Sequence, residues 1–128
     1  MLTTDQMHEL QIRYATALAN GDRAGLAACS IEDITWSIPG ASRVSGSFVG
    51  ADEVLGVGRT FAEFGYHFDV ENITFEPDDV AVILRASGAN NERTVDEVVV
   101  NVLGFVEDRV ASIVTHLSDI EGFNANFS

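Results

Sequence analysis

The sequence predicts a single α+β domain in which helices come first and an antiparallel sheet follows. Amphipathic helical patterns occupy much of the first 64 residues, and alternating apolar and polar segments with short connections fill residues 66–117. The chain has 128 residues, of which 46% are hydrophobic, so it can enclose one core but has little room for two. We therefore treat residues 1–128 as one domain.

The first helix is predicted over residues 4–20. Thr3 and Gln6 have the spacing of a capping box, which satisfies backbone N–H groups at a helix start. Gly21 can adopt the left-handed conformation that ends a helix. One face of this helix is apolar, because the following residues recur at helical spacing: Met7, Leu10, Tyr14, Ala17 and Leu18.

A short helix and a strand are predicted next. Asp22 is a suitable cap for a helix that runs through Cys29. Apolar residues alternate with Thr and Ser over 34–38, as in a half-buried strand. Residues 41–50 are rich in Ser and Gly and are expected to form a loop or a short hairpin.

A third helix and four strands complete the pattern. The helix is predicted over residues 52–64, with Asp52 as its cap. The strands are predicted at Tyr66–Phe75, Val80–Ala86, Val95–Val106 and Arg109–Leu117. Short turns separate them, including one at 87–91, so neighbouring strands should pair antiparallel.

The composition excludes several classes of partner. The formal net charge is −13, and the seven basic residues are dispersed arginines, so binding to nucleic acid or to an anionic membrane is not expected. The chain has no lysine, which excludes a Schiff-base mechanism. No apolar run approaches the ~20 residues of a membrane span. The single Cys29 fits a reducing compartment, and we expect a cytoplasmic protein.

Three segments are familiar: YATALANGD at 14–22, ITWSIPG at 34–40 and SGSFVG at 45–50. They resemble the nuclear transport factor 2-like superfamily, and most closely its SnoaL-like polyketide cyclase branch, which is related to ketosteroid isomerase and scytalone dehydratase. The resemblance implies a cone-shaped α+β barrel, with three N-terminal helices packed in a curved, mostly antiparallel sheet around an apolar pocket. It also implies a homodimer formed through the outer face of the sheet. Because this fold hosts many chemistries, the resemblance does not fix the reaction.

Four residues are candidates for catalysis. Tyr14 lies on the inward stripe of the first helix and matches the tyrosine with which ketosteroid isomerase stabilises an oxyanion, although it also fits a core tyrosine. Asn101 shares a strand face with apolar residues and could donate a hydrogen bond at any pH, or be a structural amide. His67 resembles a strand-opening histidine that faces the pocket in relatives, and otherwise it is an exposed strand end. Asp119 lies near the place where carboxyl groups act in some cyclases and epoxide hydrolases.

The predicted pocket wall is apolar. Ile38 stands where the isomerase has its general base, an aspartate, which argues against the same steroid mechanism. The expected substrate-binding residues are Trp36, Ile38, Leu55, Phe61, Leu103, Ile113 and Leu117. His116 could face either this pocket or the dimer interface.

The sequence therefore favours a cofactor-independent acid–base enzyme (a cyclase, isomerase or dehydratase) acting on a small apolar carbonyl compound such as a polyketide or a steroid-like molecule. Tyr14 and Asn101 would hold the oxyanion, and His67 or Asp119 would move the proton. No histidine or cysteine spacing suits a metal, so no metal or cofactor is expected.

Two alternatives remain open. One is a non-catalytic module of the same fold that binds a small ligand or dimerises. The other is an epoxide hydrolase, whose pattern has an arginine and an aspartate two residues apart on an inner strand. Arg93 and Asp96 are three apart here, which weakens that alternative.

Overall fold

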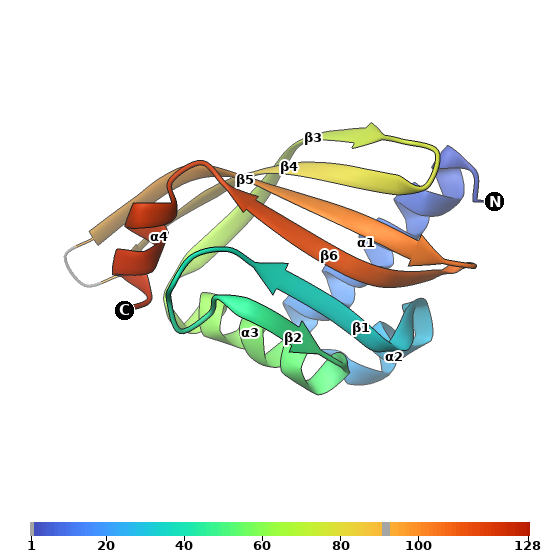
Figure 1. Cartoon of the computed structure of the whole chain (residues 1–128), viewed down its shortest axis with the longest axis horizontal. Helices are drawn as coiled ribbons and strands as arrows, with labels where there is room; N and C mark the ends of the chain where they lie inside the picture. Colours follow the sequence, from blue (N-terminus) through green and yellow to red (C-terminus); the bar gives the residue numbers. More distant parts are fainter. Residues whose placement is uncertain (1, 91–92) are drawn as a thin grey trace.

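The computed structural model describes residues 2–90 and 93–128, and the side chains of these except at 89, 90 and 93 (Figure 1). The elements follow one another as α1 (Thr4–Asn20), α2 (Arg23–Cys29), β1 (Ser30–Ile38), β2 (Gly46–Val49), α3 (Ala51–Glu63), β3 (Tyr66–Phe75), β4 (Asp79–Asn90), β5 (Arg93–Val106), β6 (Arg109–Leu117) and α4 (Ile120–Asn126). The fold is thus α+β, as the sequence predicts.

The strands form one curved sheet in the order β2-β1-β6-β5-β4-β3 (Figure 1). All neighbours pair antiparallel except β1 and β6, which are parallel. In the described residues the two ends of this order, β2 and β3, do not pair with each other, so the curved sheet is open. Two strands also separate α2 from α3, and the described chain ends in a fourth helix, which the sequence analysis missed.

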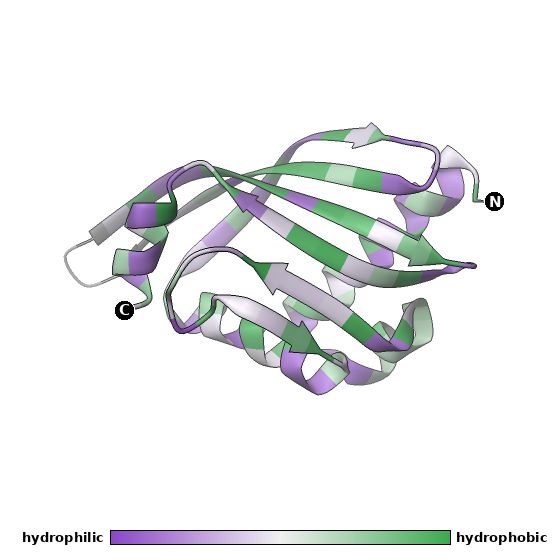
Figure 2. Cartoon of the chain, in the orientation of Figure 1, coloured by the Kyte–Doolittle hydropathy of each residue, from purple (hydrophilic) through white to green (hydrophobic). Residues whose placement is uncertain are grey.

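The core lies between one face of the sheet and the helices α1 and α3 (Figure 1). Strands β5 and β6 are largely hydrophobic (Figure 2), and buried residues alternate with less buried ones along much of each strand. In β5 the inward set includes Val95, Glu97, Val99 and Leu103, all buried. We call this side of the sheet the inner face and the opposite side the outer face.

The local signals at the first helix are confirmed. The Thr3 hydroxyl accepts from the backbone N–H of Gln6 at 3.1 Å, and the Gln6 side chain accepts from the N–H of Thr3 at 2.8 Å. Gly21 adopts φ 62° and ends α1. Asp22 caps α2 through the N–H of Gly25.

Two predicted boundaries are wrong. Asp52 does not cap α3, because Gly50 occupies the cap position and the Asp52 carboxylate instead binds Arg23 at 2.6 Å. The turn expected at 87–91 is largely strand: β4 continues to Asn90, and only Asn91 of that segment is outside the described residues. Gly88 permits this extension, since it has φ 150° and lies directly against the backbone of Gly65.

None of the described helices is both long enough and apolar enough to cross a membrane.

Candidate functional site

Three inner-face side chains form a hydrogen-bonded chain in the middle of the sheet. The Trp36 Nε1–H donates to the Thr115 hydroxyl at 2.8 Å, and that hydroxyl donates to Asn101 Oδ1 at 2.7 Å. The register places Asn101 opposite Thr115 on β5 and β6, so the contact is built into the strand pairing. The amide oxygen of Asn101 is therefore occupied, and its NH₂ group is the part that can donate to another molecule.

Tyr14 lies in the core on the inward face of α1, with 5% of its surface exposed. Its hydroxyl is buried and has no hydrogen-bond partner among the described residues. Burial, with a smaller contribution from nearby Cys29, raises the pKa of the Tyr14 phenol far above its ordinary value. The phenol is thus neutral, but no hydrogen bond joins it to Asn101 in the described structure.

Aromatic rings fill the space that the sequence analysis assigned to a pocket. Phe61 of α3 packs against five aromatic rings at centroid distances between 5.3 and 6.1 Å: Trp36, Tyr66, Phe68, Phe123 and Phe127. Six residues of the expected pocket wall lie in this core: Trp36, Ile38, Leu55, Phe61, Leu103 and Ile113. Leu117 is half-buried at its edge. These side chains therefore pack against one another, and of the seven only Ile38 and Leu117 line a described cavity, a depression of about 460 Å³ at β1, β2 and β6.

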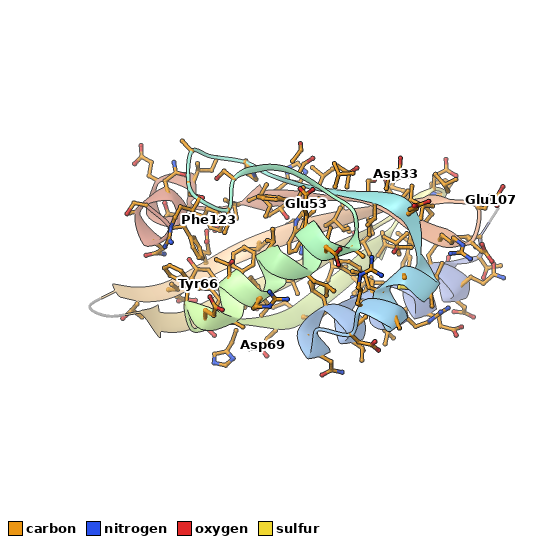
Figure 3. The ribbon with its side chains drawn as sticks, turned by 90° about the horizontal axis from the view of Figure 1, so that it is seen from below. Asp33, Glu53, Tyr66, Asp69, Glu107 and Phe123 are labelled. Carbon is orange, nitrogen blue, oxygen red and sulfur yellow. The ribbon has the colours of Figure 1, made fainter. Side chains whose placement is uncertain are left out.

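His67 on β3 and His116 on β6 both lie on the outer face of the sheet and point away from the core. His67 is exposed and pairs with Ser87, on the opposite side of the sheet from Tyr14. Asp69 shares that outer face, where it is exposed (Figure 3). His116 is also exposed and neighbours the outward Val114 in alternation, which places it on the outer face. Neither His67 nor His116 is therefore brought together with Tyr14 and Asn101.

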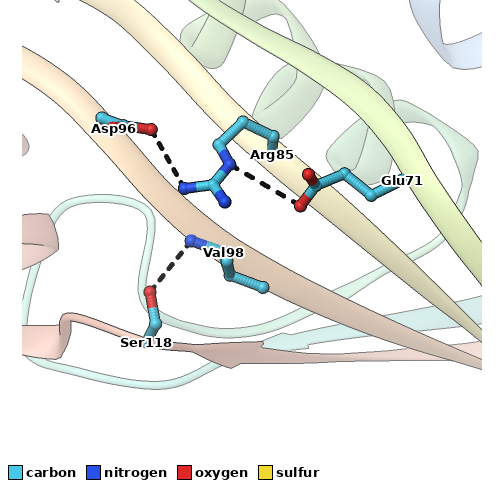
Figure 4. A network of polar contacts seen from close by, with 5 residues as sticks. All are labelled: Glu71, Arg85, Asp96, Val98 and Ser118. Atoms are coloured by element: carbon cyan, nitrogen blue, oxygen red, sulfur yellow. Dashed lines mark hydrogen bonds and ion pairs between the residues drawn. The ribbon is translucent and has the colours of Figure 1, made fainter.

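A cleft of about 310 Å³ opens where β5 passes α4. It is lined by Thr94, Val95, Asp96, Glu97, Asp119, Gly122, Phe123 and Asn126. The end of β6 is fixed to β5 by two hydrogen bonds: the N–H of Val98 donates to the Ser118 hydroxyl at 3.0 Å (Figure 4), and the N–H of Ser118 donates to the Val98 carbonyl at 3.1 Å. This connection places Asp119 beside Glu97.

Glu97 is the buried acid of this cleft. Only 7% of its surface is exposed, and its Oε2 accepts from the backbone N–H of Asp119 at 3.2 Å. Burial raises the pKa of the Glu97 carboxyl; the hydrogen bond from Asp119 opposes the rise, and the negative charge of Asp119 adds to it. Glu97 therefore keeps its proton to a higher pH than an exposed glutamate, as a general acid or base requires.

A phenol lies beside the two carboxyl groups. Asn126 Nδ2 donates to the Tyr66 hydroxyl oxygen at 2.9 Å, which leaves the phenolic proton able to donate elsewhere. Burial raises the pKa of Tyr66, Asn126 lowers it, and the charges of Glu97 and Asp119 raise it further. Tyr66 and Phe123 lie at the same end of the molecule (Figure 3). The cleft thus combines a proton-holding acid and a second carboxylate, and its lining residue Asn126 connects it to the neutral hydroxyl of Tyr66 behind it.

Of the four predicted catalytic residues, Asp119 is the one at this cleft. It caps α4 by accepting the N–H of Gly122 at 2.9 Å. The sequence analysis did not select Glu97, although strand alternation already placed it on the same face as Val99 and Asn101. A carboxyl at an inward position among apolar neighbours was the signal that could have identified it. Among the described residues, no group of three or more His, Cys, Asp or Glu side chains is arranged to hold a metal ion.

Comparison with known structures shows the same fold over nearly the whole chain. A protein from a soil-derived mobile gene cassette, Bal32a, is 23% identical with a TM-score of 0.85, and the match covers 97% of this chain and 98% of that one. An NTF2-like protein from Burkholderia xenovorans LB400 is 22% identical with a TM-score of 0.84, covering 98% and 99% of the two chains. A candidate SnoaL-like polyketide cyclase from Jannaschia sp. CCS1 is 17% identical with a TM-score of 0.78, covering 100% and 97%.

These identities establish the fold alone, and no curated protein matches the sequence. The model of the SnoaL-like domain family matches residues 12–113, which is most of the chain. That segment contains the second half of α1, strands β1 and β5, and the Glu97 position. The chain therefore belongs to the SnoaL-like domain family.

Proposed function

We propose that the protein is a cofactor-independent acid–base enzyme that transfers a proton on a small, largely apolar carbonyl compound in the cleft between β5 and α4. The observation that supports this most directly is the Glu97 carboxyl, which is nine-tenths buried, lines the cleft and has a raised pKa. Related structures include a candidate polyketide cyclase and a candidate isomerase from Rhodopseudomonas palustris, and an acid–base activity is compatible with both names.

Each group at the cleft has a role in this proposal. Ionised Glu97 removes a proton from the carbon next to the carbonyl, and its raised pKa makes it a stronger base than an exposed glutamate. The carbonyl oxygen gains negative charge, which the free phenolic proton of Tyr66 stabilises while Asn126 holds the phenol in place. Glu97 then returns the proton to another carbon, which completes an isomerisation, or to oxygen, as a dehydration requires.

The filled interior favours a second candidate, a module that binds a ligand or dimerises without catalysis. Neither Tyr14 nor Asn101 lines a described cavity, and Phe61 packs closely against Trp36 and Phe123 in the core. A filled core of this kind is compatible with a protein that keeps the fold but has no enzymatic activity. The two candidates differ in one respect: only the enzyme depends on the titration of Glu97.

The test is proton exchange at the carbons next to the carbonyl of small cyclic ketones, followed by NMR in D₂O. Glu97→Gln should reduce the exchange rate by about 100-fold or more, because a positioned acid or base contributes on the order of 10²–10⁴. Tyr66→Phe should reduce the rate, whereas Tyr14→Phe should leave it unchanged because Tyr14 is outside the cleft. Asp78→Asn, at an exposed turn, is the matched control.

Equal exchange rates for wild type and Glu97→Gln would overturn the proposal. A small epoxide assayed in parallel addresses the hydrolase alternative, because Glu97 and Asp119 form the carboxyl pair that this reaction needs. Formation of a diol without ketone exchange would also replace the proposed activity.

A further inference from the structure

The cleft has unbalanced negative charge. Three of its lining residues are acids, and none of the eight is a lysine or arginine. Asp96 already has a partner on the outer face, where Arg85 Nη1 lies 3.2 Å from its Oδ1 (Figure 4). The ion pairs found in the described residues do not include Glu97 or Asp119.

The Glu97 side chain also has an unused acceptor. Its Oε2 accepts one backbone N–H. No described donor reaches Oε1, even though only 7% of the surface of Glu97 is exposed. Glu97 lines the cavity, so this oxygen has access to a bound molecule. A carboxylate buried to this degree needs a proton or a paired cation.

We propose that the cleft binds a small organic cation, most simply a protonated amine whose N–H groups donate to Asp119 and to Glu97 Oε1. The inference rests on the proposed function and deepens it by naming the substrate class of the same site. Phe123, which is 2% exposed, also lines the cleft and offers an apolar surface to the carbon part of the ligand. The net charge of −13 concentrates cations around the protein and disfavours anionic ligands such as carboxylates and phosphates.

The volume sets the size of the ligand. A cleft of about 310 Å³ is at the lower end of the range for small-molecule sites, so it suits a ligand of one ring with a short amine. A positive charge held close to a carbonyl also makes the neighbouring C–H groups more acidic. An amine-bearing ketone would therefore both fit the cleft and react more easily there.

The test compares three probes of one shape by calorimetry or NMR titration: benzylammonium, benzyl alcohol and benzoate. Benzylammonium should bind at least tenfold more tightly than benzyl alcohol, and benzoate should bind more weakly than either. Glu97→Gln keeps an acceptor for the Asp119 N–H, and Asp119→Asn keeps a good helix cap, so both variants should fold and lose about tenfold in ammonium affinity. Asp78→Asn removes the same charge from an exposed turn and should leave the affinity unchanged.

The results separate this inference from the proposed function. Equal binding of benzylammonium and benzyl alcohol, or an equal loss of affinity in Asp78→Asn and Glu97→Gln, would overturn the cation site. If proton exchange on neutral ketones still depends on Glu97, the proposed enzymatic function remains valid even without a cation site. Conversely, ammonium binding that depends on Glu97, with no exchange on any ketone, supports the cation site and refutes the enzyme.

Discussion

At the residue scale, Glu97 links the stability of the fold to pH. Its pKa is raised above the ordinary value of 4.5 by burial and by Asp119, so the folded state holds this proton over a range where the unfolded state has lost it. The resulting stabilisation is complete below pH 4.5 and is lost as the pH rises through the folded-state pKa. The ionisable groups that face Glu97 are Asp119 and Tyr66, and Tyr66 stays neutral in this window.

Glu97→Gln should remove this dependence. The variant should match the wild type near pH 4 and have the higher melting temperature at pH 8, because glutamine does not ionise at either pH. Melting curves of both proteins across this range measure the effect. A difference that is constant with pH would mean that Glu97 titrates normally.

Tyr14 illustrates a residue whose placement the sequence predicted but whose environment it did not. Helical spacing alone put Tyr14 inside, and it is buried. Whether its hydroxyl finds a partner among the described residues depends on the tertiary packing around the ring, which no local sequence pattern encodes.

Tyr14→Phe should stabilise the protein or leave its stability unchanged. A buried hydroxyl without a partner costs about 1–3 kcal/mol, and phenylalanine keeps the ring while removing that cost. Urea unfolding measures the change. A loss of more than about 1 kcal/mol would show that the phenol has a partner in solution, since a net hydrogen bond contributes about that much.

At the scale of elements, the sequence predicted the strands more completely than the connections. The bounds of β3 and β6 agree with the expected Tyr66–Phe75 and Arg109–Leu117, because each has alternating side chains and a clear turn on both sides. The segment after Ala86 contains turn residues but continues as strand, because pairing of β4 with β5 compensates for their poor strand propensity. The stabilisation that comes from pairing with another strand cannot be predicted from the residues of one segment.

Helix α4 was missed because it is short, yet it forms one wall of the cleft. Only seven residues long, it is too short to show a helical repeat, and it is held by Phe123 and Phe127, which are 2% and 0% exposed. The sequence analysis selected Asp119 for chemistry, but its visible role is also to cap this helix. The position of the cleft therefore could not be predicted until α4 was known.

Removing the cap should loosen α4. Asp119→Ala should cost about 1 kcal/mol of stability, whereas Asp119→Asn, which retains a capping oxygen, should cost much less. Hydrogen exchange should accelerate in the alanine variant at the Phe123 amide, which donates to the Asp119 carbonyl at 3.1 Å in the first turn. Unchanged exchange would indicate that the aromatic contacts alone hold the helix.

At the scale of the whole molecule, the charge distribution leaves one surface suited to self-association. The outer face of β5 includes Val98, Val100 and Val102, all half-buried, and Val114 on neighbouring β6 is 40% exposed. A depression of about 460 Å³ beside Val114, at β1, β2 and β6, has no acid among its ten lining residues. In a chain with 20 acidic residues, such an acid-free region is where two copies can approach with least repulsion.

We therefore expect a homodimer formed through this outer face, with a mass twice that of the chain in light scattering. Two chains of charge −13 repel each other, so raising the ionic strength from about 0.01 to about 0.5 M should tighten the dimer. Val114→Glu should shift the protein to monomer, because it places a charge in the middle of the interface. The control is Val70→Glu, which adds the same charge at a 54% exposed position on the opposite side of the sheet and should remain dimeric. A monomer at all salt concentrations, or dissociation of both variants alike, would show that the outer face is an ordinary solvated surface and that the valines on it serve strand propensity alone.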